Sequence, residues 1–254
     1  NFSYCLYIFI VHKKIFMLFR AFMSFMNPRK WGVISEIYGV SKFNAAISIS
    51  YSQCAEDLCL LHLLEGQKKG FYIDIGAHDP NRFSVTRLLY HQGWNGINID
   101  ANPFIENRFR KFRPNDQFIN CAVGSEQTYQ FFQFEESAIS TVNIEWKEKF
   151  LSENNKIANN LVVPGMSLRQ IIDSTGSTRI HLLNIDIEGA DFEAIKSAEF
   201  ESMPKNKFPI WIVVETPNSV NKVVNFGLIK YLQQFEYEII SILPMSSILK
   251  LKNS

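Results

Sequence analysis

Apolar and polar residues follow two different periods along the chain after residue 50. Continuous apolar runs, typical of strands buried on both faces of a sheet, occur at residues 70–76, 96–100, 117–123, 180–185 and 210–214. Segments with the apolar spacing of helices stand beside them at residues 51–65, 84–92, 104–112, 167–173, 190–197 and 220–235. The pattern therefore predicts a parallel sheet that is covered by helices on both faces.

Three segments depart from this repeat. Residues 128–134 alternate as a half-exposed strand does, and residues 135–165, rich in Asn, Glu and Ser, predict an irregular or helical excursion. Residues 237–243 and 248–251 predict an antiparallel pair at the C-terminal edge. The fold class expected for residues 51–254 is thus one α/β domain, with a mostly parallel, doubly wound sheet and an antiparallel edge hairpin.

Residues 1–50 predict a separate helical extension that is apolar and basic. Residues 1–30 carry five basic side chains and no acidic one. One hypothesis is peripheral contact of residues 12–26 with the inner face of an anionic membrane. The alternative is a helix packed on the domain or in a homodimer interface. The sequence begins at Asn1 rather than at a methionine. Either it is trimmed, or the natural start is a later residue such as Met17, which leaves open whether residues 1–16 belong to the natural protein.

Composition narrows the function classes. Of the 254 residues, 46% are hydrophobic and 20% are charged, which excludes wholesale disorder. No run of eighteen apolar residues is present. Without residues 1–30 the chain has 21 basic and 25 acidic residues, so it lacks the basic stripe of a nucleic-acid binder. The four cysteines form no metal-binding pattern, and buried thiols in a reducing compartment predict a cytoplasmic protein.

The candidate functional residues are those that follow the predicted strands, because ligands of such sheets bind beyond the carboxyl ends of the strands. After the first strand the chain has Asp74 and a single glycine, Gly76, where a dinucleotide-binding loop has three glycines. A carboxylate there repels pyrophosphate but suits a cation. S-adenosylmethionine, with its sulfonium and amino group, fits this loop. His78, in the same loop, is either a base or a loop cap.

The next strand ends suggest how the rest of such a ligand binds. Asp100, 26 residues after Asp74, suits two ribose hydroxyls, and the segment around Asn120 would face an adenine. NAD also uses an acid at this position, so a nicotinamide-dependent oxidoreductase remains an alternative. Asp186 and Glu188, after the fourth strand, are candidates for a general base, for ligands of a divalent cation, or for acids that favour a helix dipole.

Taken together, these strand-end motifs resemble the FkbM family of methyltransferases over residues 51–215. The motifs are Tyr72-Ile-Asp-Ile-Gly-Ala77, Gly93-Trp-Asn-Gly-Ile-Asn-Ile-Asp-Ala-Asn-Pro103, Asn120-Cys-Ala-Val-Gly124 and Leu183-Asn-Ile-Asp-Ile-Glu-Gly189. Two smaller motifs are similar to a branch of that family, Ser52-Gln-x-x-Glu-Asp57 and Arg113-Pro-x-Asp116. The resemblance implies a Rossmann-like class I methyltransferase fold that uses S-adenosylmethionine for O-methylation of polyketides or of sugars in cell-surface glycans.

The resemblance also assigns residues. It implies cofactor binding by Asp74, Gly76 and Asp100, and we expect Ala77, His78, Ala101, Asn120 and Ala122 to belong to the same site. It also implies that Asp186 and Glu188 correspond to the two acidic residues that follow the fourth strand in the family. We call them the strand-four acids and expect them to be catalytic. Many family members have Asn and Gly where this chain has His78 and Pro80, so a different loop path is expected, because proline fixes its φ.

The predicted function is therefore S-adenosylmethionine-dependent O-methylation of a hydroxyl, with a sugar acceptor preferred over a secondary metabolite. A divalent metal is an optional addition. The alternatives are the nicotinamide-dependent oxidoreductase and an inactive scaffold that binds a membrane or partner through the N-terminal helix.

Overall fold

The computed structural model describes residues 48–253 apart from residues 177, 217, 220–221 and 224–225. The predicted N-terminal helix, including the membrane-contact segment 12–26, lies outside the described residues. Among the helices that are described, none combines the length and the apolar character needed to cross a membrane.

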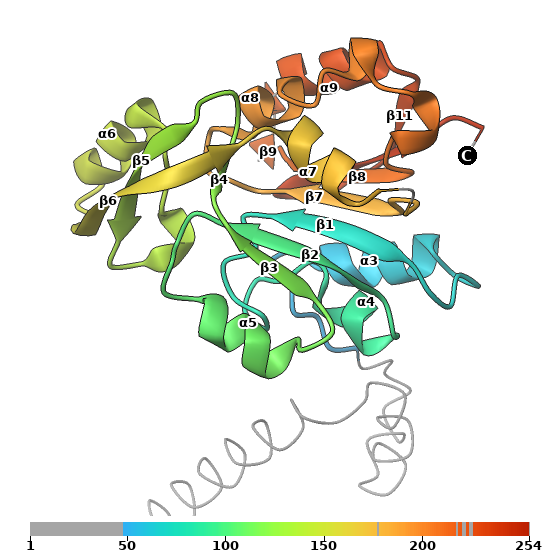
Figure 1. Cartoon of the computed structure of the whole chain (residues 1–254), viewed down its shortest axis with the longest axis horizontal. Coiled ribbons are helices and arrows are strands. Elements are labelled where there is room, and N and C mark those ends of the chain that lie inside the picture. The colour runs from blue at the N-terminus through green and yellow to red at the C-terminus, as the bar shows by residue number, and fades with distance from the viewer. Residues whose placement is uncertain (1–47, 177, 217, 220–221, 224–225, 254) are drawn as a thin grey trace, which may run out of the picture. The chain divides into compact units, whose positions relative to one another are not determined.

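Seven strands form the central sheet in the order β11-β12-β8-β7-β1-β2-β3 (Figure 1). They are β1 (Phe71–Ile75), β2 (Asn95–Asp100), β3 (Gln117–Asn120), β7 (Leu182–Ile185), β8 (Trp211–Glu215), β11 (Tyr237–Ile242) and β12 (Ser246–Leu251). The strands from β3 to β8 pair in parallel, whereas β12 runs antiparallel to both β8 and β11. This confirms the predicted doubly wound, mostly parallel sheet with its C-terminal hairpin.

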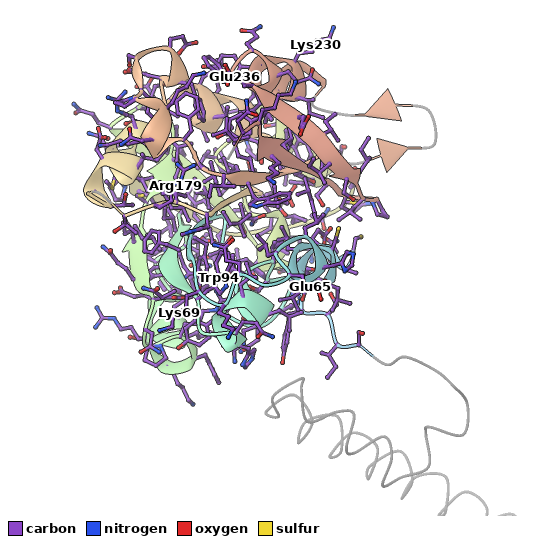
Figure 2. All side chains as sticks on the ribbon, turned by 90° about the vertical axis from the view of Figure 1, so that its right-hand side faces the viewer. Glu65, Lys69, Trp94, Arg179, Lys230 and Glu236 are labelled. Atoms are coloured by element: carbon purple, nitrogen blue, oxygen red, sulfur yellow. The ribbon has the colours of Figure 1, made fainter. Side chains whose placement is uncertain are left out.

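Helices cover both faces of this sheet (Figure 1). One layer holds α3 (Glu56–Leu63), α4 (Arg87–His91) and α5 (Glu106–Phe112), and the other holds α7 (Leu168–Ser174), α8 (Asp191–Lys196) and α9 (Phe226–Gln233). Alternate residues of β1 serve the two layers: Tyr72 packs with Leu60 and Trp94, while Ile73 and Ile75 belong to the cluster of the other layer. Trp94, labelled in Figure 2, is 2% exposed. Burial on both faces explains the continuous apolar runs of these strands.

A second sheet lies beside the first and corrects the interpretation of residues 135–165. It has the order β4-β6-β5, with β4 (Ala122–Val123), β5 (Thr128–Phe134) and β6 (Ile157–Met166). The excursion therefore contains a ten-residue strand, and only the helix α6 (Ile144–Ser152) and the short 3-10 helix η3 (Ser137–Ile139) match the prediction. The sequence pattern did not predict this strand, because Val163 is its one fully buried residue and a single buried position gives no apolar alternation.

Other element boundaries differ where polar contacts interrupt the pattern. The predicted helix 51–65 begins only at Glu56, since the Asp57 carboxylate accepts hydrogen bonds from Ser50, Tyr51 and Ser52 and holds them outside the helix. The predicted strand 117–123 divides at Cys121 between the two sheets. The first part of segment 220–235 belongs to a hairpin, β9 (Asn218–Ser219) with β10 (Lys222–Val223). Two further 3-10 helices are η4 (Phe200–Ser202) and η5 (Lys205–Lys207).

Candidate functional site

A cavity opens where the strand order reverses, between β1 and β7, at the carboxyl ends of the parallel strands. We call it the first cavity. It brings together seven of the ten residues predicted from the sequence, namely Gly76, His78, Asp100, Ala101, Ala122, Asp186 and Glu188. The apolar part of the lining comes from residues such as Ile99, Phe131 and Val142.

Asp100 presents a carboxylate at the end of β2. Its two oxygens each accept one backbone hydrogen bond at 2.8 Å, from the N–H groups of His78 and Asn102. Burial raises the pKa of this carboxyl to about 6, so it is mostly ionised at neutral pH. A carboxylate can accept about four hydrogen bonds, and capacity for ligand hydroxyls remains.

Gly76 is required by the close approach of two strand ends. Its φ is +78°, and its N–H donates to the Ile99 carbonyl at 2.9 Å. A Cβ at this position would collide with the backbone carbonyl of Asp186. The absence of a side chain thus lets the loop after β1 meet the loop after β7 at the cavity wall.

Three predicted residues lie behind the lining. The Asp74 carboxylate is buried in β1, where it accepts hydrogen bonds from Thr86 and Asn184. Ala77 packs in an apolar cluster of the α5 layer, and Asn120 donates to the Asp100 backbone carbonyl at 2.8 Å. These contacts shape the cavity from outside, and direct cofactor contact by the three residues stays a prediction.

His78 is held in an unusual position. Its φ is +50°, in the left-handed region, and burial lowers its imidazole pKa, so the ring is neutral at pH 7. Its buried Nε2 has no hydrogen-bond partner among the described residues. Such an atom is suited to a hydrogen bond with a bound molecule.

Arg113 fixes the loop that follows β1, a role that the sequence analysis did not assign to it. The guanidinium is 1% exposed. It donates to the Pro80 carbonyl at 3.2 Å, to Thr86 Oγ1 at 2.7 Å and to Ser84 Oγ at 2.5 Å. It also donates to Asn98 and pairs with Asp116. The path of the loop after β1 is therefore set by a buried cation, and the Arg-Pro-x-Asp motif was the available signal in the sequence.

The loop that carries Asp186 and Glu188 is held by the excursion. The Glu188 backbone has a φ of +48°, and its carbonyl accepts a hydrogen bond from Thr141 Oγ1 at 2.8 Å. The next carbonyl, that of Gly189, accepts from the Asn143 side chain at 3.0 Å. The Trp146 indole occupies the space that a Cβ on Gly189 would need. The excursion thus fixes the orientation of the strand-four acids.

The acids of this loop have raised pKa values. Burial raises the pKa of the Asp186 carboxyl well above its usual value, and the negative charges of Glu188 and Asp191 raise it further. Burial, followed by the charge of Asp191, raises the pKa of Glu188 to about 7, while Lys149 acts in the opposite direction. A carboxyl that titrates near neutral pH is suited to proton transfer.

A second cavity adjoins the first, and both are lined by Asp186 and Glu188. Its polar lining includes Gln53 and Glu56, which belong to the Ser52–Asp57 motif. Sequence reasoning missed Lys149, Glu215 and Ser246. Glu215 ends β8 just as Asp186 follows β7, so its strand-end position was a usable signal. No group of three or more His, Cys, Asp or Glu side chains in the described part of the chain is arranged to hold a metal ion.

His181 has a structural role in the central sheet. It precedes β7, and its Nδ1 accepts a hydrogen bond from the Phe71 backbone at 3.1 Å. Its ring packs edge-on against Trp94, with centroids 5.7 Å apart. This histidine lies outside both cavities.

Comparison with known proteins identifies the family of this chain. No curated protein matches the chain. The solved structure of a human methyltransferase 10 domain containing protein is similar, with 12% sequence identity and a TM-score of 0.41, over 90% of this chain and 98% of that one. The model of the methyltransferase FkbM domain matches residues 74–239, which include all ten residues predicted for the site. The resemblance seen in the sequence is thereby confirmed, and the chain belongs to the FkbM family of methyltransferases.

Proposed function

We propose that the protein is an S-adenosylmethionine-dependent O-methyltransferase that acts on a sugar hydroxyl. The observation that carries the cofactor assignment is the Asp100 carboxylate, fixed by two backbone N–H groups at the rim of the first cavity. It is suited to accept two ribose hydroxyls. The adjoining apolar lining, with Ala101 and Ala122, suits an adenine ring. Membership of the FkbM family supports the same cofactor.

The loop after β1 suits the methionine part of this cofactor. Gly76 lines the cavity with backbone, and the unpartnered His78 Nε2 provides a polar contact. A pyrophosphate would face this loop without the second and third glycines of a dinucleotide site. When bound, the cofactor supplies a methyl group on a positively charged sulfonium.

In this proposal the chain's own acids prepare the acceptor. Asp186 and Glu188 line both cavities. An acceptor hydroxyl at the junction of the two cavities therefore lies within reach of one of these carboxylates. Either carboxylate would accept the proton of that hydroxyl and so prepare its oxygen to receive the methyl group that the bound cofactor would supply. Positioning contributes much of the acceleration, and general base catalysis typically adds about 10²–10⁴-fold.

Calorimetric titration with S-adenosylhomocysteine tests the cofactor assignment. We expect saturable binding by the wild-type chain and at least about tenfold weaker binding by Asp100→Ala, because that variant loses charge-assisted hydrogen bonds worth about 1.5–3 kcal/mol. NAD serves as the control ligand and should not bind. Binding of NAD in place of S-adenosylhomocysteine would contradict the assignment.

The rate of methyl transfer should rise with pH. The base acts in its deprotonated form, and the pKa of Glu188 is raised to about 7. Transfer should therefore be slow at pH 5.5, increase through neutral pH and level off above about pH 8, with the two coupled acids titrating as a pair. Initial rates at saturating cofactor, measured between pH 5.5 and 9, check this profile. A rate that is constant over this range would exclude either acid as the base.

A further inference from the structure

The second cavity has no role in binding the cofactor as assigned above. It meets the first cavity at Asp186 and Glu188. An acceptor that occupies it therefore places a hydroxyl beside the proposed base and next to the methyl donor.

Carboxyl groups form one part of the lining of this second cavity. Asp186 and Glu188 follow β7, Glu215 ends β8, and Glu56 begins α3. The Glu56 carboxylate is anchored by the Cys54 N–H at 2.8 Å and by Ser246 Oγ at 3.2 Å. Fixed carboxyl groups can accept hydrogen bonds from several hydroxyls of one ring.

Aromatic side chains form another part of the lining, and they come from different elements. Phe83 belongs to the loop after β1, and Trp146 and Phe150 belong to α6. The Trp146 indole is fixed by its packing on Gly189 and by Phe150, with ring centroids 5.5 Å apart. A cavity that joins aromatic surface to hydroxyl acceptors matches a sugar ring, which has an apolar C–H face and a polar rim.

The charge of the cavity discriminates among sugars. Lys149 is the one basic residue in the lining, and its Nζ lies 4.1 Å from the centre of the Trp146 ring. Burial and the neighbouring charges of Asp186 and Glu188 raise the pKa of Glu215 to about 10. The lining holds four carboxyl groups against one ammonium group, so the carboxylate of an acidic sugar would enter a site that is poor in positive charge.

We propose that the second cavity is the acceptor site, that it selects a sugar ring without an acidic group, and that Trp146 of α6 is a residue that determines this specificity. This inference rests on the proposed function and narrows its acceptor from sugars in general to neutral and amine-bearing sugars. It also gives the excursion a second task besides holding the Asp186–Gly189 loop.

Transfer of a labelled methyl group from S-adenosylmethionine to a panel of methyl glycosides tests the charge selection. The panel contains a neutral hexoside, a 6-deoxyhexoside, a 2-amino-2-deoxyhexoside and the matched hexuronide. We expect transfer to at least one neutral or amino sugar, with a kcat/KM at least tenfold above that for the hexuronide. Equal or preferred transfer to the hexuronide, or no transfer to any glycoside, would overturn the inference.

Variants of α6 test the role of Trp146. Trp146→Ala should raise the KM for the accepted glycoside at least tenfold, and Trp146→Phe should restore most of the affinity. Ile144→Ala serves as the matched control, since Ile144 is on the same helix, is 65% exposed and lies outside the cavity. An unchanged KM in Trp146→Ala would remove Trp146 from the acceptor site.

The S-adenosylhomocysteine titration separates this inference from the proposed function. If the wild-type chain fails to bind S-adenosylhomocysteine, the proposed function itself is wrong. If it binds S-adenosylhomocysteine and methylates the hexuronide equally well or better, only the charge selection is wrong. If it binds S-adenosylhomocysteine but methylates no glycoside, the cofactor assignment stands and the sugar acceptor of the proposed function is wrong.

Discussion

Replacing Asp186 by Asn and Glu188 by Gln together should abolish methyl transfer, with a loss of at least about 100-fold, because general base catalysis typically contributes that much. Binding of S-adenosylhomocysteine should persist, since the proposed ribose contact at Asp100 is untouched and the amides keep the shape of the loop. The measurement is a single-turnover rate together with a calorimetric titration of the same preparation.

The matched control for this double variant is Glu145→Gln, on the exposed surface of α6, which should transfer at the wild-type rate. If the double variant did so too, neither acid would be the base. Loss of S-adenosylhomocysteine binding would instead assign the two acids to cofactor binding. The two single variants then show which carboxyl carries the effect, because coupled residues are not additive.

Arg113→Met should lower the free energy of unfolding by about 3–5 kcal/mol, the usual effect of removing one partner of a buried ion pair. The substitution leaves Asp116 buried without its cation and removes the donors that hold the Pro80 carbonyl and the hydroxyls of Ser84 and Thr86. Urea denaturation followed by tryptophan fluorescence measures the change.

Arg110→Met provides the contrast, since the Arg110 side chain is 73% exposed in its pair with Glu106. That variant should change the free energy of unfolding by less than about 1 kcal/mol. Arg113→Lys should not restore stability, because an ammonium group cannot reach the separate acceptors that the planar guanidinium joins. A fully stable Arg113→Met protein would show that the network contributes little.

The sequence predicted the central sheet well because burial on both faces imposes continuous apolar runs. β1, β7 and β8 are buried along almost their whole length, and their runs were visible without any structure. The Ser167 cap of α7 was equally readable, since the capping box with Gln170 is a local motif. Strand β6 was not readable, because its exposed Asn and Ala residues carry no periodic signal.

The candidate site shows the same limit. Asp100, Asp186 and Glu188 could be identified because each stands directly after a strand of the predicted sheet. Trp146 and Asn143 could not, because their contacts with Gly189 join segments about 45 residues apart that no local pattern connects. Gly76 was identified, but the structure gives a different reason for it: the Asp186 carbonyl, rather than a ligand alone, occupies the space beside it.

The position of β12 has a consequence for the order of folding. This strand lies between β8 and β11, both of which precede it in the chain, and Ser246 at its start pairs with Glu215. During synthesis β8 can already pair with β7, but β11 pairs in this sheet with β12 and cannot take its final place until residues 246–251 have left the ribosome. The second cavity, which Met245 and Ser246 help to line, is therefore completed last. A nascent chain can form the Asp100 end of the first cavity well before it can enclose an acceptor.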